Sequence, residues 1–555
     1  MNRYASATAL ALSLVCAPLW ADTAPRPIRS APGPLSAPAT APKLIVVISV
    51  DQLSSDLFDE YRKSFTGGLA RLQQGGVFPS GYQSHAASET CPGHSTILTG
   101  YRPEHTGIIA NNWTDLSAPR ADKQVYCAED ESVPGSTSSN YTVSDKHLLV
   151  PTLGERMKAA NPATRVVSVA GKDRAAVMMG GHAVDELWWW NGKAFVSYAG
   201  RATRAVVARA NAAAAANIAA PQPALDVPEV CKPHDRAVSI GGGKTVGTGH
   251  FERVAGNASA FRASPASDGA VIALAAGLVQ DMQLGKGPTT DIIAVGASAT
   301  DYIGHTYGTE GAEMCIQLQQ LDATLGSFFD VLDATGVDYE VVLTADHGGN
   351  DIPEREVDAG LPNAQRVKVE LAPTLVGKQI ATKLGLTKPT LFGDMPNGDV
   401  YLANDLTPAQ RKAVQAAAVA YYKAAPQVAE VFSAAQILAT PIPKTPPEKW
   451  TLLQRARASY KAGRSGDLIV FLKPRVTPIP DPTRGYVATH GSPYDYDRRV
   501  PILFWRKGMG GFEHRASVET VDIMPTLARQ IGLRITGPKI DGKCLDLIKA
   551  GAACR

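Results

Sequence analysis

KLIVVISVD, residues 43–51, is a run of apolar and mostly β-branched residues that ends in an acid. Such a run is typical of a central strand of a parallel sheet, which is buried on both faces. Between residues 315 and 332, apolar residues recur at helical spacing and predict a helix. Strands that alternate with helices predict an α/β fold with a mostly parallel central sheet flanked by helices. Further strands are predicted at 165–170, 291–296, 340–345 and 501–505.

Charged residues follow four of these predicted strands. They are Asp51, Lys172, Asp301 and Asp346. In an α/β sheet, ligands bind beyond the carboxyl ends of the strands. We therefore expect these four side chains to share one site.

Histidines accompany the aspartates at metal-ligand spacing. His305 follows Asp301 by four residues, and His347 is adjacent to Asp346. Taken singly, such residues are more often turn formers or surface polar groups. A mixed set of carboxylates and imidazoles at strand ends is instead typical of zinc. The candidate ligands are Asp51, Thr90, Asp301, His305, Asp346, His347 and His490.

TCPGHSTILTG, residues 90–100, is predicted to turn at Pro92-Gly93 and then to enter a helix. The hydroxyl of Thr90 would then face the positive end of the helix dipole and free backbone N–H groups, which suits an incoming anion. A threonine-rich helix start is commonly no more than an N-cap. The candidate metal ligands elsewhere in the chain are what favour a chemical role for this run.

Taken in chain order, these residues make the chain resemble the alkaline phosphatase superfamily. Within it, the chain is most similar to the threonine-nucleophile bacterial alkaline phosphatases related to nucleotide pyrophosphatase/phosphodiesterases, over residues 46 to about 510. The resemblance implies an alkaline phosphatase-like core, two zinc ions, and hydrolysis of phosphate monoesters through a phosphothreonine at Thr90. It assigns Asp301, His305 and His490 to one zinc ion, and Asp51, Thr90, Asp346 and His347 to the other.

Asn111, Lys172 and Arg174 are expected to bind the phosphate. The resemblance places Asn111 on a non-bridging oxygen, with Asn112 as the alternative. Lys172 and Arg174 alternate after a strand and so can reach the same side. Two cations there would bind the extra charge of a monoester, although this spacing is also common in solvated loops.

Diesterase relatives are expected to carry apolar contacts in place of the two cations, so the chain is predicted to prefer monoesters. A phosphodiesterase or nucleotide pyrophosphatase on the same core is the alternative. An exported metal- or phosphate-binding protein without activity is the alternative from another class.

The net charge of +3, with no basic run, argues against a nucleic-acid partner. We expect a monomer that acts on small phosphate monoesters.

The amino terminus predicts export. Arg3 precedes an apolar stretch at 5–15 and then small residues, which together predict a signal peptide over 1–21. The apolar stretch is too short to span a membrane. Residues 22–42 are rich in proline and alanine and are expected to form a flexible tether. We therefore expect a periplasmic or secreted protein.

Six of the seven cysteines lie outside the signal peptide. An even number in an exported chain favours disulfides over free buried thiols, but the count alone leaves the pairing open. A Cys544–Cys554 bond is expected because both residues lie in the short tail. The sequential pairs that remain are Cys91–Cys127 and Cys231–Cys315.

Two stretches interrupt the alternation of strands and helices. The core is expected over 43–352, and 481–555 completes it. An insertion at about 186–280 begins with Trp188-Trp190, which an Asn-Gly turn predicts to be part of a hairpin rather than a ligand platform. A second insertion, 353–480, has proline-rich joints and is predicted to be a cap subdomain.

Overall fold

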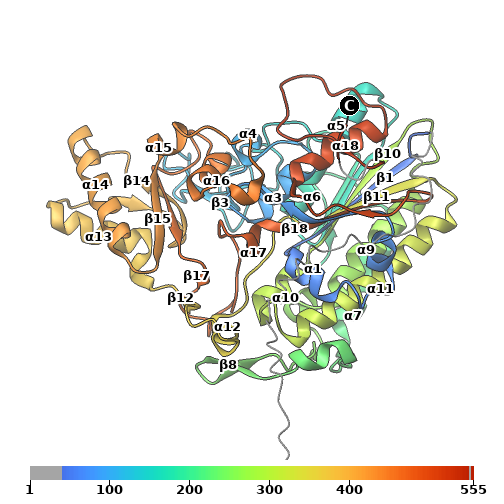
Figure 1. The fold of residues 1–555 in the computed structure, drawn as a ribbon, viewed down its shortest axis with the longest axis horizontal. Coiled ribbons are helices and arrows are strands. Elements are labelled where there is room, and N and C mark those ends of the chain that lie inside the picture. Colours follow the sequence, from blue (N-terminus) through green and yellow to red (C-terminus); the bar gives the residue numbers. More distant parts are fainter. Residues whose placement is uncertain (1–39, 549–551, 555) are drawn as a thin grey trace, which may run out of the picture.

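A ten-stranded mixed sheet runs through the core of the protein (Figure 1). The computed structural model describes residues 40–548 and 552–554, so the predicted signal peptide and nearly all of the predicted tether lie outside the described residues. The five central strands are parallel neighbours. In sheet order they are β11 (Tyr339–Thr344), β1 (Leu44–Val50), β10 (Asp291–Ala297), β5 (Val166–Ala170) and β6 (Glu186–Trp190).

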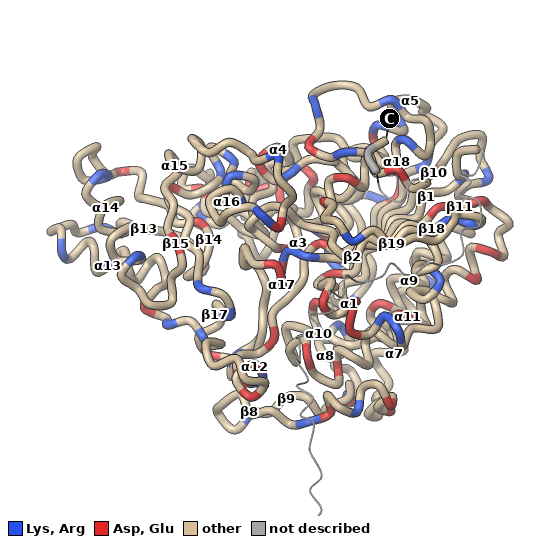
Figure 2. The backbone as a smooth tube through the Cα atoms, viewed as in Figure 1, with Lys and Arg blue, Asp and Glu red and all other residues tan. Residues whose placement is uncertain are grey.

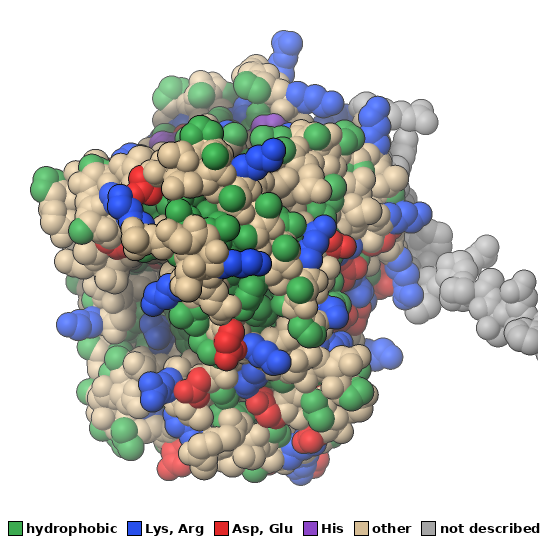
Figure 3. Space-filling view, turned by 90° about the vertical axis from the view of Figure 1, so that its left-hand side faces the viewer, with side chains coloured by type: hydrophobic (Ala, Val, Ile, Leu, Met, Phe, Trp, Pro, Cys, Tyr) green, Lys and Arg blue, Asp and Glu red, His purple; other side chains and the backbone are tan. Residues whose placement is uncertain are grey.

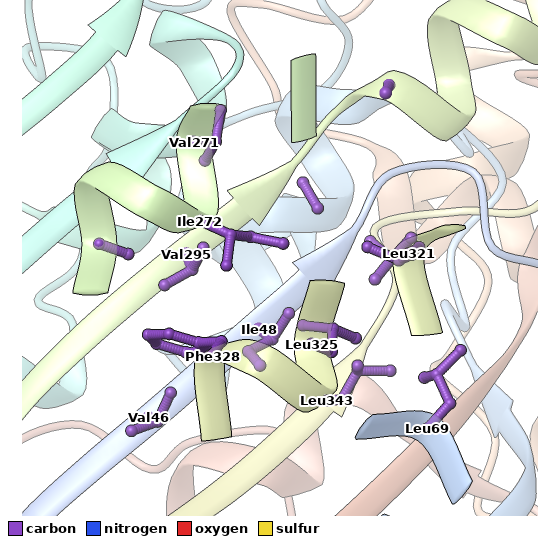
Figure 4. Close-up of a cluster of buried hydrophobic side chains, with 14 of the residues drawn as sticks. Val46, Ile48, Leu69, Val271, Ile272, Val295, Leu321, Leu325, Phe328 and Leu343 are labelled. Carbon is purple, nitrogen blue, oxygen red and sulfur yellow. The ribbon is translucent and has the colours of Figure 1, made fainter. Parts of the chain in front are cut away.

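Strand β1 explains why residues 43–51 are apolar without alternation. Val46 and Ile48 pack on one face of the sheet, where Figure 4 shows them beside Leu325 and Phe328. The intervening side chains belong to a second cluster on the opposite face. Both faces are therefore covered, which confirms the α/β fold. The first face is covered by α9 (Pro265–Asp281) and α11 (Ala312–Ala334), the second by α3 (Thr90–Ile97) and α18 (Ile523–Gln530).

The other predicted strand, at 501–505, is present but runs antiparallel. It is β18 (Arg499–Arg506), which pairs with β11. Apolar periodicity reports burial and carries no information on strand direction, which the connecting segment decides. The sheet continues through β2 (Gly76–Tyr82) to β19 (Phe512–Glu513) and β20 (Val518–Glu519).

The tryptophan triplet lies in a hairpin, as predicted. Strand β6 pairs antiparallel with β7 (Phe195–Val196), and Trp190 lies opposite Phe195. Trp188 is 1 % exposed, so the triplet packs inside the protein and offers no surface to a ligand. An alanine-rich helix, α7 (Ala205–Ala219), follows.

The segment predicted to be a cap contains a separate four-stranded sheet with its own apolar core. It lies at the left of Figure 1, away from the main sheet. The helix α16 (Leu452–Ser459) joins it to the core, because Ser459 Oγ accepts a hydrogen bond of 2.8 Å from the backbone N–H of Ala86. The strands are β13 (Leu391–Phe392), β14 (Gly398–Leu402), β16 (Leu468–Leu472) and β15 (Val428–Ser433), packed with α13 (Pro373–Leu384) and α14 (Pro408–Ala424).

Short elements complete the chain. In the core these are α1 (Ser55–Tyr61), α2 (Gly68–Leu72), α4 (Pro103–Thr106), β3 (Asn112–Thr114), β4 (Gln124–Tyr126), α5 (Leu153–Ala160), α6 (Asp173–Gly180), α8 (Ala258–Arg262), α10 (Ala299–Tyr307) and α17 (Asp495–Arg498). Two further short helices are α12 (Pro353–Asp358) and α15 (Ala434–Leu438).

Acidic and basic residues are interspersed along the described chain (Figure 2). The face in Figure 3 likewise mixes both charges with apolar side chains. This distribution agrees with a net charge of +3 and offers no basic stripe on that face. In the described part of the chain, every helix falls short of the length and apolarity needed to cross a bilayer.

The three predicted disulfides are all present. Cys91–Cys127 ties the first turn of α3 to the residue after β4. Cys231–Cys315 ties the predicted insertion at about 186–280 to α11, and Cys544–Cys554 closes the tail.

Replacing Cys231 and Cys315 together by serine should lower the free energy of unfolding by about 4 kcal/mol, because the bond joins residues 84 positions apart. Chemical denaturation measures the loss. The double replacement of Cys544 and Cys554, only 10 positions apart, should cost less. Equal losses in the two variants would contradict the assignment of the larger constraint to the Cys231–Cys315 bond.

Candidate active site

Four predicted site residues meet at one edge of the sheet. Asp51 directly follows β1, and Lys172 follows β5 as the N-cap of α6. Asp301 lies in the first turn of α10, after β10, and Asp346 follows β11. Because these four strands are parallel neighbours, their carboxyl ends share an edge. All four side chains are buried there, at 0–2 % exposure.

Lys172 links two of the aspartates. Its Nζ lies 3.0 Å from Asp51 Oδ2 and 2.5 Å from Asp301 Oδ2. Burial opposes its charge, but the carboxylates of Asp301 and Asp51 outweigh burial and raise the pKa of Lys172 above its ordinary value. A fixed positive charge therefore lies between the two strand ends.

Three histidines surround Asp301. The Nε2 atoms of His305, His347 and His490 lie 3.4, 3.9 and 3.3 Å from Asp301 Oδ1. On each ring, Nδ1 faces a backbone carbonyl and carries a proton, so Nε2 is the nitrogen that would bind a metal after losing any proton it holds. The carbonyls belong to Ala488 at 2.8 Å from His305, Gly348 at 2.7 Å from His347 and Ser88 at 2.8 Å from His490.

A second group forms around Asp51 and Asp346. His94 lies between them, with Nε2 at 3.3 Å from Asp51 Oδ1 and Nδ1 at 3.3 Å from Asp346 Oδ2. His94 was not among the predicted ligands. The signal was its position four residues after Thr90, which on a helix places the two residues on the same face. His347 connects the groups, because its Nε2 is also 3.2 Å from Asp346 Oδ2.

The ionisation of these groups is set by their neighbours. Burial opposes ionisation of Asp301, yet Lys172 and then His305 hold the pKa of its carboxyl well below the usual range. Burial also opposes ionisation of Asp346, but His347 and His94 lower its pKa. Burial lowers the pKa of His347, and the charge of Asp346 outweighs this and raises it to about 9. The carboxylates are therefore charged.

The donor atoms fit divalent cations. Several of them are buried without a hydrogen-bond partner among the described residues, which is costly unless another group satisfies them. Carboxylate oxygens with imidazole nitrogens are the donors that zinc-type ions prefer. The unpartnered atoms include Oδ1 of Asp51, Oδ1 of Asp301, Oδ2 of Asp346 and Nε2 of His347.

Thr90 begins helix α3 beside these groups. A close contact sets the position of the helix, since a Cβ at Gly93 would lie 2.0 Å from the backbone oxygen of Asp346. Only glycine permits that approach. Arg174 Nη2 donates to Thr90 Oγ1 across 3.5 Å, so the hydroxyl lies between a helix N-terminus and a guanidinium group.

Asn111 and Arg174 also border the hydroxyl. Asn111 Oδ1 accepts a hydrogen bond of 2.8 Å from the N–H of Cys91, which leaves its NH2 group free for a ligand. Lys172 and Arg174 occupy the N-cap and first turn of α6 rather than alternating along an extended segment. The expectation of strand alternation was therefore wrong in its geometry, although both side chains still reach the site edge.

The site opens into a cavity of about 370 Å³ between the main sheet and the predicted cap. Asn111, Arg174 and His490 line it from the core side. Met395 and Tyr401, from the predicted cap, line it on the other side. The segment 353–480 thus contributes directly to the walls of the site.

Comparison with known proteins gives the class to which this fold and site belong. The family model for type I phosphodiesterase / nucleotide pyrophosphatase matches residues 45–493. The chain therefore belongs to this family, within the alkaline phosphatase superfamily, as the resemblance predicted.

Individual relatives are similar to this chain over most of its length. The chain is 58 % identical over 514 residues to alkaline phosphatase PhoK of Sphingomonas sp, which covers 92 % of each chain. It is 47 % identical over 513 residues to alkaline phosphatase PhoD of Zymomonas mobilis, covering 92 % of this chain and 89 % of that one. The crystal structure of alkaline phosphatase PafA matches with a TM-score of 0.77 at 23 % identity, over 90 % of this chain and 97 % of that one, and confirms the fold.

Replacing His94 by alanine should weaken the binding of a divalent cation at Asp51 and Asp346 by about 10- to 100-fold, because these carboxylates lose the imidazole that lies between them. Titration of the metal-depleted protein with zinc measures the affinity. The control is His182→Ala, since His182 is an exposed residue just beyond the C-terminus of α6. Unchanged zinc affinity in His94→Ala would refute a role for this residue at the site.

Proposed function

We propose that this protein hydrolyses phosphate monoesters to an alcohol and inorganic phosphate, with Thr90 as the nucleophile. The observation that carries the proposal is the placement of the Thr90 hydroxyl at a helix N-terminus, 3.5 Å from the Arg174 guanidinium and one helical turn before His94, which lies between Asp51 and Asp346. Two of its relatives, at 58 % and 47 % identity, are named alkaline phosphatases.

The preference for monoesters rests on two cations at the site, the buried Lys172 and the half-buried Arg174. The side chain of Lys172 is fully buried, and that of Arg174 points at Thr90 Oγ1. A monoester dianion carries one more negative charge than a diester and gains more from two cations in a site of low dielectric. We infer that a diester, with an ester group in place of that charge, is the poorer substrate.

Two zinc ions complete the proposed site. Asp301, His305 and His490 would hold one, and Asp51, Thr90, Asp346 and His347 the other. When bound, zinc ions would lower the pKa of the threonine hydroxyl and stabilise negative charge on the phosphate and on the leaving oxygen.

The residues of the chain would then divide the reaction into two displacements. Thr90 Oγ attacks phosphorus, and the bond from phosphorus to the alcohol oxygen breaks, leaving a phosphothreonine. The NH2 group of Asn111 and the guanidinium of Arg174 hold the non-bridging oxygens. Water next attacks phosphorus and Oγ departs, so two inversions leave the configuration retained.

The three disulfides fit an oxidising compartment. We propose that the protein acts in the periplasm or outside the cell after removal of residues 1–21. We further propose that 353–480 serves as the cap subdomain of the enzyme, since it lines the cavity together with the core.

Replacing Thr90 by alanine should reduce kcat/KM for p-nitrophenyl phosphate by ~10³-fold or more, because the attacking oxygen is removed. Thr90→Ser retains a hydroxyl and should keep a substantial part of the activity. Circular dichroism checks that both variants are folded. Substantial turnover by the alanine variant would disprove the nucleophile assignment.

Replacing Arg174 by alanine should reduce kcat/KM for p-nitrophenyl phosphate by roughly 10- to 100-fold, because one or two charge-assisted hydrogen bonds to the phosphate are lost. The loss for bis-p-nitrophenyl phosphate should be several-fold smaller, because the diester lacks the second charge. Arg209→Ala, at an exposed position of α7, is the matched control. Equal losses on the two substrates would count against the monoester preference.

A further inference from the structure

The cavity extends beyond the position expected for the phosphate. Thr90, Arg174 and Asn111 define that position at its core end. The remaining walls, toward the predicted cap, must face the alcohol portion of a monoester. Their chemistry therefore decides which alcohols fit.

These walls carry three carboxylates. Glu89 lies beside the core end, and Asp394 and Asp399 come from the predicted cap. The ion pairs found among the described residues include none of the three. Arg174 is the one lysine or arginine among the described residues that line the cavity, and it is directed at Thr90.

Two of the carboxylates, Glu89 and Asp399, are held in place by backbone N–H groups. Glu89 Oε2 accepts a hydrogen bond of 2.7 Å from the N–H of Asn111, and Asp399 Oδ1 accepts one of 2.6 Å from the N–H of Gly466. Burial raises the pKa of Asp399 to about 7, and Glu89 adds to the shift. Once ionised, Asp399 repels the other carboxylates of the cavity, and a cation between them would relieve the repulsion.

Aromatic rings line the same space. Tyr401 and Phe471 belong to the predicted cap, and Tyr486 lies across the cavity. One face of the Tyr486 ring stacks on His305 with 4.2 Å between centroids, while the residue remains 42 % exposed. Aromatic faces combined with carboxylates are the surroundings that bind ammonium groups.

We propose that this part of the cavity selects phosphate monoesters of amino alcohols, whose alcohol carries an ammonium group, and disfavours monoesters whose alcohol carries an anion. The selection rests on the proposed hydrolysis of monoesters. It assigns Asp394 and Asp399 as specificity-determining residues, with no part in the displacement at phosphorus.

The test compares phosphocholine with 3,3-dimethylbutyl phosphate, which has the same shape but a neutral carbon in place of nitrogen. For each protein, we take the ratio of the two kcat/KM values at a pH above 9. The two leaving groups differ in reactivity, but this difference is the same for every variant and cancels when the ratios are compared. Asp394→Asn and Asp399→Asn should each lower this ratio about threefold to tenfold, because one attractive charge is lost. Glu370→Gln, an exposed carboxylate outside the cavity, should leave the ratio unchanged.

Asp394 is exposed and has no hydrogen bond among the described residues, so its replacement keeps the test valid if Asp399→Asn fails to fold. An unchanged ratio in Asp394→Asn would overturn the proposal, as would hydrolysis of 3-phosphoglycerate at the rate of phosphocholine. In both cases turnover of p-nitrophenyl phosphate would leave the proposed function standing. Failure to hydrolyse any of these monoesters would instead refute the proposed function itself.

Discussion

The ammonium group of Lys172 lies between the carboxylates of Asp51 and Asp301, and the arrangement of the whole sheet edge depends on this contact. Burying an ionised carboxylate costs several kcal/mol unless opposite charge accompanies it. Three buried aspartates at neighbouring strand ends would otherwise repel one another. Lys172, His94 and His347 offset part of this charge, yet carboxylate oxygens of Asp51, Asp301 and Asp346 still lack a hydrogen-bond partner among the described residues, which suits the edge to further cations.

The same strands that form the core deliver these charges. Strand β1 is apolar on both faces because helices cover both sides of the sheet, and its parallel pairing with β10 and β11 aligns the ends at which the aspartates lie. The glycine at 93 then lets α3 approach the backbone of Asp346, which places the hydroxyl of Thr90 against the edge. Packing and chemistry are thus linked, since a shift of one strand would separate the ligands.

Much of this could be predicted from the chain alone. The apolar runs identified the central strands, and the order of Asp, His, Thr and Lys residues identified the family. The disulfide pairs were expected because Cys544 and Cys554 share the short tail and the remaining cysteines pair in sequential order, in a chain predicted to be exported. His94 was missed although it follows Thr90 by four residues, the same spacing that identified His305 after Asp301. The antiparallel direction of β18 was missed because burial patterns do not depend on strand direction.

By itself the sequence determined the elements of the core and the residue types that meet at its edge, because burial periodicity and the positions after strands are local properties. Only the tertiary structure decided which residues line the cavity. Glu89 and Asp394 are more than 300 residues apart, and their position on one wall depends on how the predicted cap packs against the core. Contacts between such distant segments arise from three-dimensional packing, which no local pattern encodes.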